Sequence, residues 1–264
     1  MTTIRKGYAD SRDGQIHYRA AGAPHAPALL FLHQTASSGA MYEKVMASMA
    51  DHRRCLAFDT PGFGGSFAPT GQTSLRYYAE RLIEAVDALG VERFDLCGHH
   101  TGGCIALEIA DLVGARLRSL TLIGPVIASA AEREEFSRTF TEPFSVVADG
   151  SHLQKAWDYL VTIGAHQTLP LHHREMIDHL IGAEAMPKAF SAVWRQNSEA
   201  LLSAVSVPLL LMISDDDALW PLFHHATELR PDAEVAMVKG MDFQPDVDPE
   251  GVAQSLARFL DLIG

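Results

Sequence analysis

The residues best placed to do chemistry lie in the stretch Gly98-His-His-Thr-Gly102. A short apolar run from Phe94 to Cys97 comes before this stretch, and an apolar-periodic segment from Cys104 to Leu112 comes after it. The pattern predicts a strand, a sharp turn and a helix, and the two glycines allow the strained backbone and the close approach that such a turn needs. His100 occupies the tip of the turn, where an imidazole can serve as a base or as a nucleophile.

This strand–turn–helix context resembles the nucleophile elbow of the α/β-hydrolase fold family, whose G-x-S-x-G motif carries a serine where this chain has His100. A second match is Asp59-Thr-Pro-Gly-Phe-Gly-Gly-Ser66, which is similar to the family's D-x-P-G-x-G-x-S loop. The chain is identified as an atypical, capped member of this family. The resemblance covers nearly the whole chain and implies an α/β fold with an inserted cap.

The resemblance assigns aspartates to the two other positions of the family's catalytic triad. The family's acid follows the seventh strand in a G-x-x-D-x-x-x-P pattern, and the matching segment places Asp217 at that position. The family's histidine precedes the proline that begins the last helix, and counting back from Pro249 gives Asp242. The last histidine of the chain, His225, comes before the eighth strand, so the ordinary Ser-His-Asp triad is absent.

An exchange of residue types between two facing positions is implied. We expect His100, at the serine position, to meet the carboxylate of Asp242, at the histidine position, with Asp217 nearby. A carboxylate partner favours the imidazolium and fixes the ring tautomer, so the ring nitrogen that faces the cleft becomes a better base. We favour a general base that activates water over direct acylation of the imidazole, because a base needs no attack from a congested turn.

Two other interpretations of the same residues stay open. His100, Asp217 and Asp242, with His33 or His99, offer ligand types that suit a metal. Their spacing matches no metal motif, however, and we predict neither a metal nor a cofactor. The second alternative is a binding protein that has lost its triad.

The resemblance also implies an oxyanion site. In the family, one donor is the backbone N–H that follows the elbow residue, and here that is the N–H of Thr101 at a helix N-terminus. The second donor comes from the loop after the third strand, where the position favours the amide of Gln34. We group His33 with these oxyanion and substrate-binding residues, although a loop-shaping role is the interpretation we favour for its side chain.

Strand and helix patterns alternate along much of the chain. Asp13-Gly14 lies between two β-prone runs and predicts a hairpin. Buried strands are predicted for the apolar runs 28–33, 54–59, 94–97, 119–124, 207–214 and 233–239, and core helices for 74–89 and 252–263. The alternation predicts a doubly wound, mostly parallel sheet.

The strand pattern stops between about residue 130 and residue 205. Four helical segments are predicted there: 131–141, 151–164, 169–184 and 186–205. In the family an insertion before the seventh strand is the cap over the active site. We therefore predict an α/β-hydrolase core of residues 1–129 and 206–264 and a helical cap of residues 130–205. Trp157, Phe190 and Trp194 should pack the cap onto the sheet, and one or two of them could line a substrate chamber.

Composition and charge limit the partners. The chain has 264 residues, 47% of them apolar, which is enough for a full core. Its 21 basic and 33 acidic residues give a net charge of −12 without a basic block, which disfavours nucleic acids and anionic membranes. There is no signal-like or membrane-spanning run, and three cysteines in core-like patterns suggest reduced thiols, so we expect a cytoplasmic protein. A small-molecule substrate is the expected partner, and a homodimer is left open.

These features predict a hydrolase for a small, partly apolar carbonyl compound such as an ester, a lactone or a β-dicarbonyl. His100 is the expected base, held by Asp242 and supported by Asp217. A lyase or isomerase that uses the same base for proton transfer at carbon, as in decarboxylation or C–C cleavage, is an alternative. A non-catalytic ligand-binding protein is another.

Because no serine occupies position 100, serine-directed fluorophosphonate probes are expected to leave the protein unlabelled. Intact-protein mass spectrometry after incubation with the probe measures this. Stoichiometric labelling at Ser37, Ser38 or Ser66 would put the active centre elsewhere.

Overall fold

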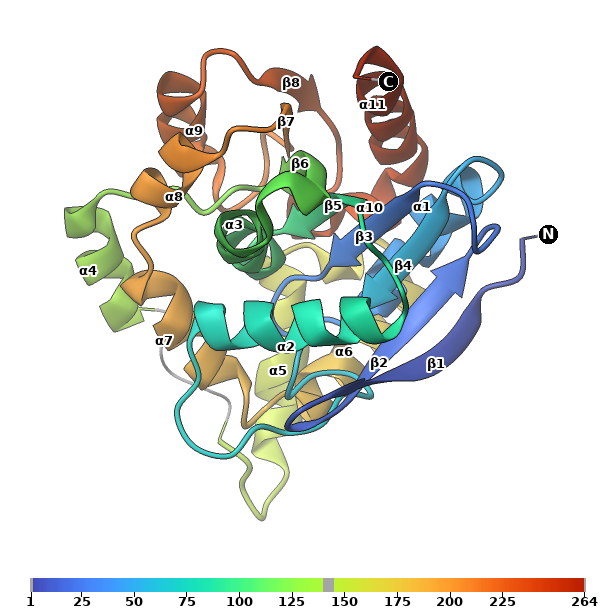
Figure 1. Ribbon diagram of the computed structural model, residues 1–264. Helices are drawn as coiled ribbons and strands as arrows, with labels where there is room; N and C mark the ends of the chain where they lie inside the picture. The colour runs from blue at the N-terminus through green and yellow to red at the C-terminus, as the bar shows by residue number, and fades with distance from the viewer. Residues whose placement is uncertain (1, 140–144, 264) are drawn as a thin grey trace.

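The computed structural model describes residues 2–139 and 145–263 (Figure 1). Its sheet consists of β1 (Arg5–Ser11), β2 (Gly14–Ala21), β3 (Ala28–Leu32), β4 (Arg54–Phe58), β5 (Phe94–His99), β6 (Leu117–Ile123), β7 (Leu209–Ile213) and β8 (Glu234–Met237). The α-helices are α1 (Glu43–Met49), α2 (Leu75–Ala88), α3 (Thr101–Val113), α4 (Ala130–Thr139), α5 (Ser151–Thr162), α6 (Leu169–Ile181), α7 (Met186–Arg195), α8 (Ser198–Ala204), α9 (Phe223–Leu229), α10 (Gln244–Val247) and α11 (Pro249–Leu262).

The strand order is β1-β2-β4-β3-β5-β6-β7-β8. Strands β1 and β2 form the antiparallel hairpin predicted at Asp13-Gly14, and β2 is antiparallel to β4. All neighbouring pairs from β4 to β8 are parallel, and parallel strands need crossover connections such as helices. The predicted α/β class with a mostly parallel sheet is confirmed.

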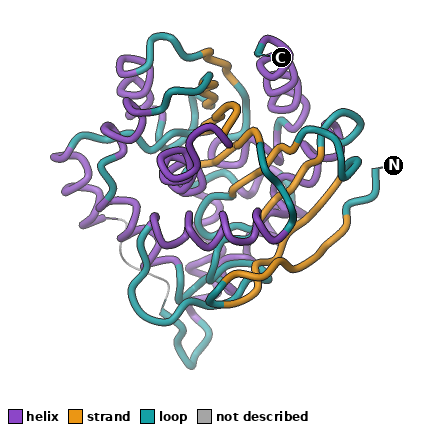
Figure 2. The backbone as a smooth tube through the Cα atoms, in the orientation of Figure 1, coloured by secondary structure: helices purple, strands orange, loops and turns teal. Residues whose placement is uncertain are grey.

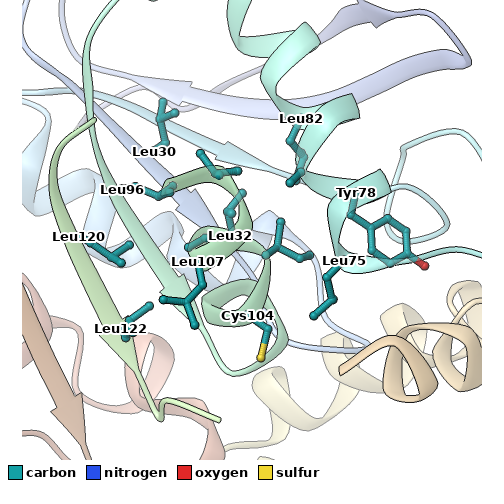
Figure 3. Packing of buried hydrophobic residues seen from close by; sticks show 14 of the residues in the cluster. Leu30, Leu32, Leu75, Tyr78, Leu82, Leu96, Cys104, Leu107, Leu120 and Leu122 are labelled. Atoms are coloured by element: carbon teal, nitrogen blue, oxygen red, sulfur yellow. The ribbon is translucent and has the colours of Figure 1, made fainter. Parts of the chain in front are cut away.

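Side chains that alternate along the strands divide the core into two layers. In β3, Leu30 and Leu32 belong to the layer that packs against α2 and α3, whereas Leu29 and Phe31 belong to the layer under α1 and α11. Figure 3 shows the first layer, with Leu82 of α2 and Leu107 of α3 close to the strand leucines. A strand that is buried on both faces is continuously apolar, and Figure 2 shows the strands running between the helices.

Helices α4 to α8 fill the interval between β6 and β7, and the described residues there contain no strand. Figure 1 shows α4, α5, α6 and α7 along the left and lower sides of the molecule. The helix predicted for residues 186–205 is interrupted at Gln196 and Asn197, and the Asn197 side chain caps α8. Residues 140 and 141, predicted to end the first of these helices, lie outside the described residues. The boundaries of core and cap stay a prediction.

Helix α6 is bonded to the loop that follows β3. The hydroxyl of Ser37 donates to Glu175 at 2.9 Å, and the hydroxyl of Ser38 donates to Asp178 at 2.8 Å. Both carboxyl groups are buried. Burial, together with the charge of Glu175, raises the pKa of Asp178 to about 7. Two neighbouring serines of one loop thus hold two acids one turn apart on the same helix.

The three cysteines, Cys55, Cys97 and Cys104, are buried and unpaired, as predicted for core thiols. Burial raises the pKa of Cys55 to about 12 and that of Cys104 to about 12, so both stay protonated. Within the described ranges, no helix combines the length and the apolar character that a membrane crossing requires.

Glycines bring β5 and α3 together at the elbow. A Cβ atom added to Gly98 would overlap the carbonyl of Gly102, and one added to Gly102 would overlap the carbonyl oxygens of Leu32 and His33. Gly103 has more room, because a Cβ atom there would lie 3.4 Å from the carbonyl oxygen of Gly98. The close approach predicted from the two outer glycines is confirmed.

Gly102→Ala should therefore lower the free energy of unfolding by at least about 2 kcal/mol, since a backbone carbonyl would have to move. Gly103→Ala is the matched control: it should stay within about 1 kcal/mol of the wild type, because alanine also favours the helix. Urea unfolding followed by circular dichroism measures both. Equal stability of the two variants would contradict the packing argument.

Candidate active site

His100 stands at the tip of the turn between β5 and α3. Its backbone has φ 47° and ψ −113°, a conformation that costs a non-glycine residue free energy and is found at functional sites. The N–H of His100 donates to the carbonyl of Ile123 at 3.0 Å, and its carbonyl accepts from Gly103 at 2.8 Å and Cys104 at 3.1 Å. These bonds hold the strained turn and present the imidazole at the carboxyl end of the central strands.

The imidazole of His100 is hydrogen-bonded to Asp217. Its Nε2 lies 2.9 Å from Oδ2 of Asp217, and the two side chains are 12% and 0% exposed. An ionised carboxylate can only accept, so in the neutral ring Nε2 carries the hydrogen and Nδ1 keeps the lone pair. Gly124 makes room for the ring, because a Cβ atom there would overlap the imidazole. Nδ1 is the nitrogen left for a reacting molecule.

The predicted pairing of His100 with Asp242 is wrong. An imidazole is much longer than a serine side chain, so from the elbow it reaches the acid after β7 directly. Asp242 is shorter than the histidine that the family carries at its position, and its Oδ1 accepts the N–H of Ala218 at 3.0 Å instead. Asp242 still acts on His100 through its charge.

Three donors hold the carboxylate of Asp217. Besides His100, the N–H of Leu219 donates to Oδ1 at 2.7 Å, and Nε2 of Gln244 donates to Oδ2 at 2.6 Å. Burial raises the pKa of Asp217, but the charge and hydrogen bond of His100 and the bond from Leu219 outweigh burial and bring it below its ordinary 3.8. Asp217 is therefore ionised at neutral pH.

The pKa values of His100 and Asp242 are both raised above their ordinary values. Burial lowers the pKa of His100, yet the charge and hydrogen bond of Asp217, with the charge of Asp242, raise it above the ordinary 6.5. Burial raises the pKa of Asp242 to about 6; the charge of His100 opposes this rise, and the charge of Asp217 adds to it. Because the groups interact, they titrate together and not independently.

A cavity lies over this dyad of His100 and Asp217. His100 and Asp242 form part of its wall. The remaining wall residues, most of them apolar, are Gln34, Thr35, Thr101, Val126, Tyr159, Ile163, Phe190, Val193, Trp194, Ala218 and Leu219. Of the three cap aromatics singled out from the sequence, Phe190 and Trp194 line the cavity, while Trp157 stacks on His172 with ring centroids 3.7 Å apart.

Gln34 and Thr101, the two residues predicted to supply oxyanion donors, both lie at the cavity. Helix α3 begins at Thr101, and the first N–H groups of a helix have no acceptor within the helix. Gln34 is fixed by its side chain, whose Nε2 donates to the carbonyl of Asp242 at 2.8 Å. The placement suits amide donors that would face a developing negative charge.

His33, in contrast, is not part of the cavity wall. Its ring is buried, with Nδ1 2.7 Å from the carbonyl of Gln34, and its Nε2 accepts the N–H of Thr60 at 2.9 Å. Burial lowers its pKa below 6.5, so the ring is neutral and donates from Nδ1. The structure thus does not place His33 among the substrate-binding residues, and both ring nitrogens serve to shape the loop.

His99 lies beneath the elbow. Its ring centroid is 4.2 Å from that of His100, and neither ring nitrogen has a partner with hydrogen-bond geometry among the residues described. Burial, and then the charge of His100, brings its pKa far below 6.5, so the ring is neutral.

His99, His100 and Asp217 each offer one atom that could bind a metal ion, and these three atoms lie within 4.8 Å of one another. A cation there would have to displace the proton shared by His100 and Asp217, and a metal-free site stays a prediction.

Two residues of the site escaped the sequence analysis. Gln244 donates a hydrogen bond to Asp217, but the sequence around Gln244 contains no motif that predicts this contact. Only the path of the loop after β8 brings the two residues together. Tyr159 reaches the cavity from α5; burial and the charge of Asp242 raise its pKa to about 12. In the sequence Tyr159 is one of several aromatic residues on cap helices, and helical spacing alone could not select it.

Fold and site together define an enzyme of the hydrolase class, and comparison with known proteins agrees. The family profile of the α/β-hydrolase fold matches residues 27–240. The chain belongs to the α/β-hydrolase fold family.

Related sequences and structures carry hydrolase names. The chain is 29% identical over 241 residues to "Putative carbamate hydrolase RutD" of Azorhizobium caulinodans, covering 88% of this chain and 89% of the relative. It is 31% identical over 137 residues to haloalkane dehalogenase 2 of Mycobacterium tuberculosis, covering 51% and 47%. Esterase RhEst1 from Rhodococcus sp. ECU1013 has a TM-score of 0.80 at 19% identity, covering 99% of each chain. The enol-lactonase from Burkholderia xenovorans LB400 has a TM-score of 0.76 at 18% identity, covering 97% and 100%.

The dyad also links stability to pH. The raised pKa of His100 adds stability that is fully present below its unfolded value, ordinarily 6.5, and is lost as pH rises through the folded value. The lowered pKa of Asp217 adds stability that is present above its ordinary 3.8 and is lost as pH falls through the folded value. The stabilising contributions of His100 and Asp217 are therefore both fully present only between about pH 3.8 and pH 6.5.

Asp217→Asn should lower the pKa of His100 below 6.5, because burial then acts without the facing charge. Asp242→Asn should lower it less, since Asp242 acts through charge alone. Titration of the His100 ring signals by NMR measures both shifts, with the buried ring of His33 as an internal reference. A larger shift in Asp242→Asn than in Asp217→Asn would refute the dyad.

Proposed function

We propose that the protein hydrolyses small, uncharged, partly apolar carbonyl compounds such as esters, lactones or β-dicarbonyls, with His100 as general base. The observation that carries this proposal is that His100 bonds to Asp217 through Nε2 at 2.9 Å while the same ring forms part of the cavity wall. A general base needs a partner on one nitrogen and access to the reacting molecule on the other. The names of the relatives, a carbamate hydrolase, an esterase and an enol-lactonase, support a carbonyl substrate.

In the proposed reaction, Nδ1 of His100 takes a proton from a water molecule as the water oxygen bonds to the carbonyl carbon. The carbonyl oxygen gains negative charge and is stabilised by the N–H groups of Thr101 and Gln34. Asp217 stabilises the imidazolium that forms. The bond to the leaving oxygen then breaks, and His100 returns its proton to that oxygen, which gives an acid and an alcohol.

The charge of the cavity supports an uncharged substrate. Among the described residues that line it, none is lysine or arginine, and the ionisable side chains are His100, Tyr159 and Asp242. A free carboxylate on the substrate would lie near two aspartates with only His100 to balance them. The net charge of −12 also repels anions from the whole molecule.

Proton transfer at carbon is the second candidate, and the behaviour of Asp242 favours it. With a pKa of about 6, Asp242 can supply a proton on the same apolar wall on which His100 accepts one. Such a pair could move a proton to or from the carbon next to a carbonyl group, with the enolate oxygen at the amides of Thr101 and Gln34. Deuterium uptake at that carbon in heavy water, without hydrolysis, would distinguish this reaction from ester cleavage.

His100→Ala and Asp217→Asn should each reduce kcat/KM by at least about 100-fold, because the first removes the base and the second removes the charge that stabilises its protonated form. The double variant should be little worse than either single variant, since the two residues act as one unit. A panel of neutral esters and lactones, each beside an analogue with a free carboxylate, supplies the substrates. Multiplicative losses in the double variant, or faster turnover of the carboxylate analogues, would contradict the proposal.

A rebuilt triad provides the positive control. His100→Ser combined with Asp242→His restores the family's residue types at both exchanged positions and keeps Asp217. This double variant should react with a fluorophosphonate probe, whereas His100→Ser alone should not. Equal labelling of the two variants would show that the two positions do not face each other.

A further inference from the structure

Gln244 is a buried amide in contact with the dyad. It is 0% exposed and begins helix α10. Its Nε2 donates to Oδ2 of Asp217 at 2.6 Å, and that oxygen also accepts from Nε2 of His100 at 2.9 Å. One carboxylate oxygen thus serves two donors, and the shorter of the two bonds comes from Gln244.

The hydrogen bond to Asp217 explains why an amide side chain suits position 244. An ionised carboxylate accepts only, so the amide must turn its NH2 group toward Asp217 and its oxygen away. Oε1 of Gln244 and both ring nitrogens of His99 are buried without a partner of hydrogen-bond geometry in the described part of the chain. The side chain of Gln244 also acts on His99, against the larger effect of burial. A glutamate at position 244 would place a second carboxylate next to that of Asp217. An apolar residue there would leave His100 as the one remaining donor to Oδ2 of Asp217.

A carboxylate that accepts more hydrogen bonds holds a neighbouring proton less tightly, because each donor stabilises its negative charge. We propose that Gln244 is a positioning residue that holds the carboxylate of Asp217 against His100 and limits how strongly that carboxylate retains the proton on the ring. The effect on catalysis rests on the proposed function, whereas the effect on the ring itself does not.

The charged and titratable groups around His100 define what else could change its protonation: Asp217 after β7, Asp242 after β8, His99 at the end of β5 and Tyr159 of α5. Burial keeps His99 neutral, and the raised pKa of Tyr159, about 12, keeps that hydroxyl protonated. The two aspartates are therefore the charges that act on the ring near neutral pH. Gln244 donates to one of them and leaves the other to Ala218.

The test is the protonation of His100 in Gln244→Met, a variant of similar length without a donor. Its His100 pKa, measured by NMR titration of the intact protein, should rise by about half to one pH unit. Gln244→Glu should raise it further, because a second negative charge then faces the dyad. An unchanged His100 pKa in Gln244→Met overturns the proposal, and if that variant does not fold, the absence of a rise in Gln244→Glu does so.

Gln196→Met is the matched control. Gln196 is also buried, and its Nε2 donates to a carboxylate, Glu108, at 2.8 Å and to the carbonyl of Cys104 at 3.0 Å. Both methionine variants should lose stability, but only Gln244→Met should move the His100 titration. A similar rise in both would mean that general loosening of the fold is the cause and would overturn the proposal.

Kinetics give a second readout once a substrate is found. In Gln244→Met the acid limb of the pH profile of kcat/KM should move to higher pH by the same amount as the NMR titration. KM should stay near the wild-type value at high pH, because Gln244 is not among the described residues that line the cavity. A failed substrate screen would count against the proposed hydrolysis, whereas a failed NMR shift would count against the role of Gln244 alone.

Discussion

The hydrogen bond between His100 and Asp217 is the interaction around which the rest of the site is arranged. It joins the turn after β5 to the loop after β7, two segments that only the folded sheet brings together. Because the side chain of Asp217 is 0% exposed, its charge must be satisfied by donors within the protein. Leu219 and Gln244 supply the remaining donors. The hydrogen bonds of one buried carboxylate therefore hold both the loop after β7 and the loop after β8.

A histidine at the elbow changes which of the three triad positions, those of His100, Asp217 and Asp242, contact one another. In the ordinary arrangement the base lies between the nucleophile and the acid. Here the imidazole is attached to the elbow and contacts Asp217 directly, which leaves Asp242 on the cavity wall without a bond to the histidine. The site gains a second carboxyl group that can exchange protons near neutral pH, and it loses the hydroxyl that an acyl-enzyme would need.

The sequence was sufficient to predict the sheet, the elbow and the position of Asp217, because apolar runs, glycines and spacing to a proline are local signals. It could not predict which carboxylate contacts His100. That contact depends on the length of an imidazole measured against the distance between two loops, and no local pattern records such a distance. Gln244 and Tyr159 were missed for a related reason, since they join the site through the path of a loop and the docking of a helix. His33 was close in sequence to the cavity residues but turned its ring toward Thr60.

The hydrogen bonds from Ser37 and Ser38 to α6 connect that helix with the cavity wall. These serines belong to the same short loop as Gln34, so movement of α6 away from the core would pull on a residue of the cavity wall. Tyr159 of α5, Phe190 of α7 and Ile163, which follows α5, line the same cavity. Two side-chain hydrogen bonds thus couple the position of α6 to a loop that forms part of the cavity wall.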